Sequence, residues 1–212
     1  MNVVSVNIAK PTTIIFNNKK EQTGIYKTET ESVFIGKNGV MHDTVSDRVH
    51  HGGEDKACYI FGYNHYESWR KIFPELHFTY GIFGENITLD MVNEENFRIG
   101  DILKIGKATV QITQPRQPCY KLGIRFQNQD AVTIFRDSVS PGIYVRVLEE
   151  GTVKKDDVCQ LVQTDENAPG LLAVFRLIYQ KETIPDILEK TLQHPVTAKR
   201  LKDYLRKKFN VK

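Results

Sequence analysis

Short β-forming runs, interrupted repeatedly by turn residues, fill the first three quarters of the chain and constrain its fold most strongly. Runs rich in Val, Ile, Phe and Tyr are separated by Gly, Asn, Asp and Pro. Strands this short and this regularly interrupted are typical of β-barrels and β-sandwiches. The predicted strands cover residues 2–8, 32–35, 57–61, 102–105, 108–113, 142–147 and 158–162. We therefore expect a mainly β domain over residues 1–163.

One helix is predicted to interrupt this β region, over residues 62–72. Its apolar side chains fall three positions apart at Tyr63, Tyr66 and Trp69, and Pro74 follows as a stop.

The character of the chain changes after Thr164, where three helical patterns follow one another. They cover residues 171–180, a segment that begins near Thr183 with Pro185 in its first turn, and residues 197–209. We expect these helices to form a small three-helix domain over residues 164–212.

The C-terminal helices carry a strong basic bias. Residues 190–212 contain eight Lys or Arg and a single acid, Asp203. Such a run usually marks a solvated helix face. Docking to an acidic protein is the alternative, whereas nucleic acid is not an expected partner because no recognised binding motif accompanies the charge.

Bulk features predict a globular protein of a reducing compartment. The 212 residues are enough to bury a sizeable core, and no run approaches the ~18 apolar residues that a membrane span needs. The first residues lack the pattern of a signal peptide. The cysteines Cys58, Cys119 and Cys159 are odd in number and far apart, which favours free thiols and a cytoplasmic location.

Cys119 is the most informative candidate for chemistry. It lies in the stretch PRQPCYKL over residues 115–122, where two prolines fix the backbone and exclude a helix interior. Arg116 and Lys121 lie within three residues, and a cation near the sulfur favours the thiolate, which is both nucleophile and metal ligand. Cys58 and Cys159 lie in apolar strand patterns and are expected to be inert.

Three glycine-bearing segments upstream offer contacts for an anion. The first, HGGEDK over residues 51–56, combines two glycines that permit positive φ with His51 and Lys56. The second, GIFGEN over residues 81–86, suggests a forced bend followed by Glu85 and Asn86. The third, residues 23–28, contains Lys27. Each is also compatible with ordinary turn chemistry.

Several reaction types remain open on these residues alone. No GxSxG, P-loop or dinucleotide-binding glycine motif is present. Composition leaves room for a cysteine hydrolase built from Cys119, His51 and Asp55.

The order of the motifs resembles that of the YiiM-type MOSC domain proteins. The segments around Lys27, Asp43, residues 51–57, residues 83–86 and residues 99–101 come before the stretch 114–122. The resemblance covers about residues 1–163, and the helical remainder is similar to a three-helix extension in that subfamily. Two positions depart from the family pattern, which usually has Gly at position 42 and Pro at position 54.

The resemblance implies a MOSC-type β-barrel with a few helices that binds the molybdenum cofactor, a molybdenum-molybdopterin. Cys119 would be the catalytic residue and the metal ligand. The cofactor-binding residues would be Lys27, His51, Lys56, Asn86, Arg116 and Lys121. The implied activity is reduction of small N-hydroxylated compounds, such as hydroxylamino-purines and amidoximes, to amines.

Electrons would come from a separate reductase, because the chain has no flavin or haem motif of its own. Two alternatives stay open. In one, Cys119 carries a persulfide between proteins. In the other, the protein is a non-enzymatic binding module that works through its basic tail.

Overall fold

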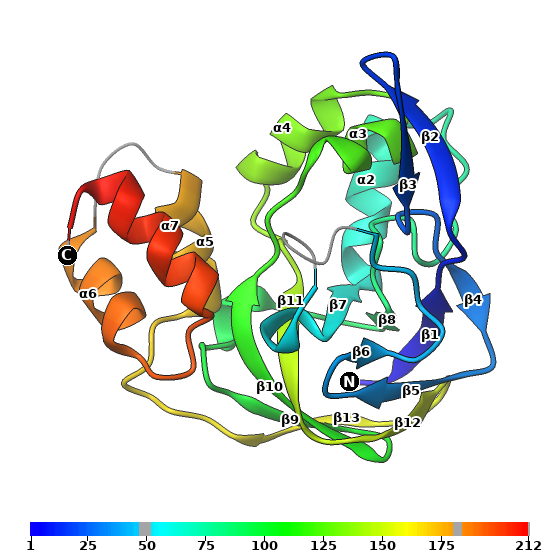
Figure 1. Ribbon diagram of the computed structural model, residues 1–212. Helices are drawn as coiled ribbons and strands as arrows, with labels where there is room; N and C mark the ends of the chain where they lie inside the picture. Colours follow the sequence, from blue (N-terminus) through cyan, green and yellow to red (C-terminus); the bar gives the residue numbers. More distant parts are fainter. Residues whose placement is uncertain (47–51, 180–183, 212) are drawn as a thin grey trace.

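An eight-stranded mixed sheet forms the centre of the computed structural model, which describes residues 1–46, 52–179 and 184–211 (Figure 1). In spatial order its strands are β13 (Cys159–Gln163), β9 (Ile102–Ile105), β10 (Ala108–Pro115), β11 (Ile143–Glu149), β7 (Cys58–Gly62), β8 (Ile87–Leu89), β1 (Val3–Ile8) and β4 (Thr28–Thr30). Neighbouring strands are antiparallel except for β7 and β8, which are parallel. The strands predicted from the sequence are all present, with ends shifted by one or two residues.

The predicted closed barrel is wrong, because β13 and β4 lie at opposite edges of an open sheet. Closure would require these two edges to pair. Instead the chain leaves β4 directly for β5 (Ser32–Gly36), which pairs with β12 (Gly151–Lys154) and β6 (Gly39–Val40) in a separate three-stranded sheet. A third unit is the hairpin of β2 (Thr12–Phe16) and β3 (Lys19–Thr23).

The β region also contains more helix than the sequence indicated, so the fold is mixed rather than mainly β. The predicted helix is confirmed as α2 (Tyr66–Ile72), preceded by the short 3-10 turn η2 (Tyr63–His65). Two further helices, α3 (Tyr120–Arg125) and α4 (Asp130–Asp137), lie between β10 and β11 and were not predicted. Each has at most eight residues, too few for a clear helical period.

Three helices follow the sheet: α5 (Leu171–Tyr179), α6 (Pro185–Gln193) and α7 (Lys199–Phe209). Pro185 lies in the first turn of α6 as predicted, but the N-cap position is Ile184, and Thr183 lies outside the described residues.

Apolar side chains from the helices and the sheet form one continuous core. Leu171, Val174 and Leu177 of α5 are fully buried in the same cluster as Val110 and Ile112 of β10. The boundary predicted at residue 163 therefore separates two kinds of secondary structure that share a core, and as a domain boundary it stays a prediction.

A second, aromatic core packs α2, α3 and α4 against the sheet. Phe61, Trp69, Phe83, Phe126 and Phe135 are all buried there, with several ring centroids 4.3 to 6.4 Å apart. This rigid layer supports the loops that surround the candidate site.

No helix within the described ranges is long and apolar enough to span a bilayer.

Candidate functional site

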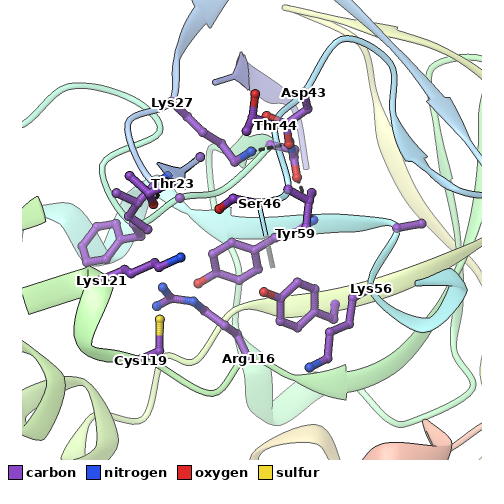
Figure 2. Close-up of a pocket in the computed structure, with 18 residues that line it drawn as sticks. Thr23, Lys27, Asp43, Thr44, Ser46, Lys56, Tyr59, Arg116, Cys119 and Lys121 are labelled. Carbon is purple, nitrogen blue, oxygen red and sulfur yellow. Dashed lines mark hydrogen bonds and ion pairs between the residues drawn. The ribbon is translucent and has the colours of Figure 1, made fainter. Parts of the chain in front are cut away.

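A cavity lies between the sheet, α3 and the loops that precede β4 and β7 (Figure 2). It brings together segments that are far apart in sequence. Six of the seven predicted site residues line it: Lys27, Lys56, Asn86, Arg116, Cys119 and Lys121. The seventh, His51, lies outside the described residues.

A bulge in β10 directs the cysteine-bearing segment toward this cavity. The pairing of β10 with β11 shifts register between Ile112 and Gln114. The hydroxyl of Thr113, at the bulge, lies 2.6 Å from the carbonyl oxygen of Asp55 and 3.0 Å from that of Tyr144, and its one hydrogen can be donated to either. Bulges of this kind bend a strand and re-aim its side chains. Residues 116–119 then leave the sheet without regular structure, as the two prolines predicted.

Arg116 lies under the cavity, 4% exposed, between two aromatic rings. Its Cζ is 5.1 Å from the ring centroid of Tyr59 and 4.8 Å from that of Phe135. Burial acts to lower the pKa of Arg116, but Tyr59, Tyr144 and Cys119 raise it by more, so the guanidinium stays charged. Its Nη1 is buried without a hydrogen-bond partner among the described residues. A buried guanidinium nitrogen left unpaired is costly unless a ligand completes it.

Cys119 is partly exposed and occupies the N-cap position of α3. Its backbone is extended, with φ −124° and ψ 171°, so the segment turns sharply from the loop into the helix. Figure 2 shows the sulfur directed toward the guanidinium of Arg116 and toward the side of the cavity where Lys121 lies. The cysteine and both predicted cations therefore face one space.

Lys121 and its neighbour Tyr120 connect α3 to the β2–β3 hairpin. Lys121 Nζ lies 3.4 Å from the carbonyl of Gln22, and the Tyr120 hydroxyl donates to the carboxylate of Glu21. The ring of Tyr120 stacks on Phe16 with centroids 4.3 Å apart. These contacts hold the hairpin beside the cysteine and fix the first turn of α3.

Asp43 joins Lys27 and Asn86 on the opposite wall. One carboxylate oxygen forms an ion pair with Lys27 and accepts from Asn86 Nδ2 at 2.8 Å, and the other accepts from the Ala9 amide at 2.8 Å. Asn86 Nδ2 also donates to the carbonyl of Asn7 at 3.2 Å. Both N–H donors of Asn86 are thus used inside the protein. An ammonium has three donors, so Lys27 has two beyond the one used for Asp43, its ion-pair partner among the described residues.

The bend predicted at residues 81–86 is confirmed. Gly81 and Gly84 have φ of 79° and 83°, and the Gly84 amide donates to the Gly81 carbonyl at 2.9 Å. Glu85, however, points into the protein. Its buried carboxylate accepts from the amides of Gly81 and Phe83 and from the hydroxyls of Tyr66 and Thr88, so it fixes the loop instead of facing the cavity.

The segment 52–55 leads into Lys56 and Ala57, which line the cavity together with Tyr144. Gly53 has a φ of 95°, as the paired glycines predicted, and precedes the 3-10 turn η1 (Glu54–Lys56). Lys56 Nζ lies 5.5 Å from the ring centroid of Tyr144. His42, where the family usually has glycine, adopts a φ of 63°, a left-handed conformation that glycine adopts more readily than other residues.

Sequence reasoning gave no role to Tyr59 and Tyr144, which are opposed in the pairing of β7 with β11. Their ring centroids are 5.2 Å apart, and both residues line the cavity. Burial raises the pKa of both hydroxyls, so both stay protonated near neutral pH. The signal available in the sequence was two tyrosines in apolar runs, but only the strand register places them together.

The two other cysteines are buried, as expected. Burial raises the pKa of Cys159 to about 12 and that of Cys58 further. Neither lines the cavity, so Cys119 is the cysteine that a ligand in the cavity meets.

Comparison with known proteins places the fold and the site in a family. The MOSC domain family matches residues 47–160, a segment that contains β7, β10, β11 and the cysteine-bearing loop. The chain belongs to the MOSC domain family. Bacillus subtilis YflK, itself uncharacterised, is 35% identical to this MOSC protein over 191 residues, which cover 90% of the chain and 86% of YflK.

A solved structure confirms the relationship to YiiM over the whole length. The crystal structure of YiiM from Geobacillus stearothermophilus superimposes with a TM-score of 0.81 at 30% identity, covering 98% of each chain. The C-terminal helices are therefore part of the shared fold. A Gibberella moniliformis protein named Reductase is 31% identical over 179 residues, which cover 82% of this MOSC protein and 32% of that relative. The chain thus spans about a third of its length.

The residues in the cavity fit the cofactor to which the family name refers, the molybdenum cofactor. A pterin phosphate is an anion, and the buried Arg116 Nη1 lacks a partner among the described residues. A partly exposed thiol gives a soft donor, which suits a redox transition metal better than an alkaline-earth ion. The described residues contain no cluster of three His, Cys, Asp or Glu side chains for a metal held by protein alone. The lining of the cavity thus combines one thiol with several cations, and this combination fits an anionic group that carries a soft metal.

Proposed function

We propose that this MOSC protein is a molybdenum cofactor-dependent reductase of small N-hydroxylated compounds, with Cys119 as the protein ligand to the metal. One observation carries this proposal: Cys119 and Arg116 line the same cavity, and Nη1 of the buried Arg116 guanidinium has no hydrogen-bond partner among the described residues. When bound, the cofactor would supply the two-electron chemistry of N–O bond cleavage.

The residues of the cavity would hold the anionic cofactor and leave its metal-bearing end at the cysteine. Arg116 and Lys121 stand beside Cys119 and would balance negative charge, Arg116 through its unpaired Nη1. Lys27, on the opposite wall of the cavity, would donate its remaining N–H groups to the cofactor. Asn86 would act by holding Asp43, and through it Lys27, in place.

Tyr59 and Tyr144 would form an aromatic wall for a planar ligand. Their rings line the cavity, and Arg116 lies against Tyr59 from below. The hydroxyl of Tyr59 is occupied by a hydrogen bond to the Pro141 carbonyl at 3.0 Å, which fixes that ring. Rings held in this way offer a flat surface without loss of side-chain entropy on binding.

The relatives give limited support for a redox activity. The Gibberella moniliformis protein is named Reductase, and the region it shares with this chain is about a third of its length. We infer by analogy that this chain reduces its substrate with electrons from a separate reductase. This donor, the N-hydroxylated substrate and the cytoplasmic location remain parts of the proposal.

The test compares native protein with Cys119→Ser and with Cys159→Ala, which removes a thiol outside the cavity. Molybdenum and pterin content and the reduction of a hydroxylamino-purine by dithionite-reduced methyl viologen are measured. We expect Cys119→Ser to lose at least ~100-fold in rate and Cys159→Ala to keep it. Full activity in Cys119→Ser would refute the ligand role. Transfer of a labelled persulfide without bound metal would favour the sulfur-carrier alternative instead.

A further inference from the structure

The first turn of α7 concentrates positive charge where a helix usually avoids it. Lys199 and Arg200 are exposed there, and the turn contains no acid. The N-terminal end of a helix carries a partial positive charge, which favours acids and disfavours cations. By contrast, Arg206, Lys207 and Lys208 in the last turn are placed favourably, and Lys208 donates to the carbonyls of Leu177 and Ile178.

A second group of neighbouring cations lies one turn further along α7. Burial lowers the pKa of Lys202, and the nearby cations Arg206 and Arg146 lower it further. The acids within reach are engaged: Asp55 pairs with Arg146 at 2.5 Å, and Asp203 with Arg206 at 3.7 Å. Neighbouring cations at this spacing destabilise a helix. Cations at the N-terminal end of a helix and next to one another cost stability, and proteins tend to keep such costs at functional sites.

This charge lies beside the cavity. Asp55 Oδ2 accepts from the backbone amide of Lys199 at 3.3 Å, while the same carboxylate binds Arg146. The next residue, Lys56, lines the cavity itself. The backbone amide of Ala198 also donates to the carbonyl of Thr113, at the bulge of β10. Figure 1 shows the N-terminal end of α7 next to β10.

We propose that the basic surface formed by Lys199, Lys202 and Arg146 is the docking site of an acidic electron-donor protein. The inference rests on the proposed function, since a reductase of this kind needs electrons from outside. A donor must therefore approach the cavity, and complementary charge beside the entrance steers such encounters and raises their rate.

An acidic protein fits this surface better than nucleic acid does. The basic surface is small: it consists of Lys199 and Lys202 on one turn of α7 and Arg146 on the neighbouring strand β11. Two acids, Asp55 and Asp203, lie among these cations. Nucleic-acid sites use longer basic tracks or aromatic platforms for bases. Electron-transfer complexes, in contrast, are small and depend on charge.

The experiment uses the full cofactor-loaded chain and flavodoxin, an acidic one-electron flavin protein, as the probe. The test variant is Lys199→Glu with Lys202→Glu. The control is Lys107→Glu with Lys207→Glu, which changes net charge equally at exposed lysines, one in the turn after β9 and one in the last turn of α7. Calorimetry gives the dissociation constant, and dithionite-reduced methyl viologen gives the rate without a protein donor.

We expect the test pair to weaken flavodoxin binding by about tenfold or more at low salt, with the difference lost at high salt. The control pair should change binding by less than about twofold, and both pairs should keep the viologen-driven rate. Equal weakening by both pairs, or no weakening by either, would overturn the docking site. Absence of viologen-driven turnover in native protein would instead overturn the proposed function, because the binding measurement does not depend on it.

Discussion

The guanidinium of Arg116 lies against the ring of Tyr59, with Cζ 5.1 Å from the ring centroid. This contact joins the loop after β10 to strand β7, and it fixes the charge beside Cys119. A guanidinium packed on an aromatic ring is attracted to the ring face, while the N–H groups at its edge point away from the ring. In this protein one nitrogen of that edge, Nη1, is buried and has no partner within the described residues.

Replacement of Arg116 by Met should separate stability from cofactor binding. Met fills a similar volume without a buried charge, so the exchange removes the cost of keeping the guanidinium away from water. We expect an unchanged or higher free energy of unfolding together with loss of most bound molybdenum and pterin. Urea unfolding and metal analysis measure the two quantities. Arg125→Met is the control, because Arg125 lies over Tyr26 and does not line the cavity; equal cofactor loss in both variants would contradict the role of Arg116.

Replacement of Asp43 by Asn should be strongly destabilising. The Asp43 and Lys27 side chains are 3% and 7% exposed, so the change leaves a buried ammonium without its counter-charge. Breaking a buried pair from one side costs about 3–5 kcal/mol. The double change Lys27→Met and Asp43→Asn should cost less than Asp43→Asn alone. A double-mutant cycle in urea gives the coupling free energy, and additive effects would show that the pair contributes nothing.

The three thiols should differ sharply in reactivity. Cys119 is partly exposed, whereas burial raises the pKa of Cys159 from 9.0 to about 12 and that of Cys58 further. Iodoacetamide near neutral pH should therefore label Cys119 alone in the native protein, as mass spectrometry of peptides would reveal. Labelling of Cys58 or Cys159 at a comparable rate would contradict this burial.

The same thiols predict how stability changes at alkaline pH. The folded state keeps their protons over a range in which the unfolded state loses them. Their contribution to the free energy of unfolding is therefore full below pH 9.0 and declines as pH rises toward about 12. Cys159→Ala should reduce this decline in urea unfolding measured across that range, and an unaltered slope would contradict the prediction.

Gly81 should tolerate alanine less well than Gly53. Both have positive φ, of 79° and 95°, which penalises any side chain. At Gly81 the added Cβ would also lie 2.9 Å from Cβ of Lys27, whereas at Gly53 no atom of the described residues lies within 4 Å. We expect Gly53→Ala to cost about 1–3 kcal/mol from backbone strain and Gly81→Ala to cost more and to lower cofactor content. Equal unfolding free energies would show that the close approach to Lys27 is relieved at no cost.

Much of the fold could be predicted because its signals are local. Alternating β-forming runs located the strands, and Tyr63, Tyr66 and Trp69 at helical spacing located α2. The open sheet could not be predicted, because whether β4 meets β13 depends on the path of β5, a non-local matter of pairing. Helices α3 and α4 were missed because their burial comes from the aromatic core and not from a long periodic pattern.

The sequence by itself determined which residues are candidates for chemistry. It singled out Cys119 between prolines and cations and inert thiols elsewhere, since proline geometry and apolar context are local properties. Only the tertiary structure decided what these residues face. It placed Tyr59 opposite Tyr144, turned Glu85 inward, and set the first turn of α7 beside the cavity. Register and packing join residues distant in the chain, and their free energy depends on the whole fold.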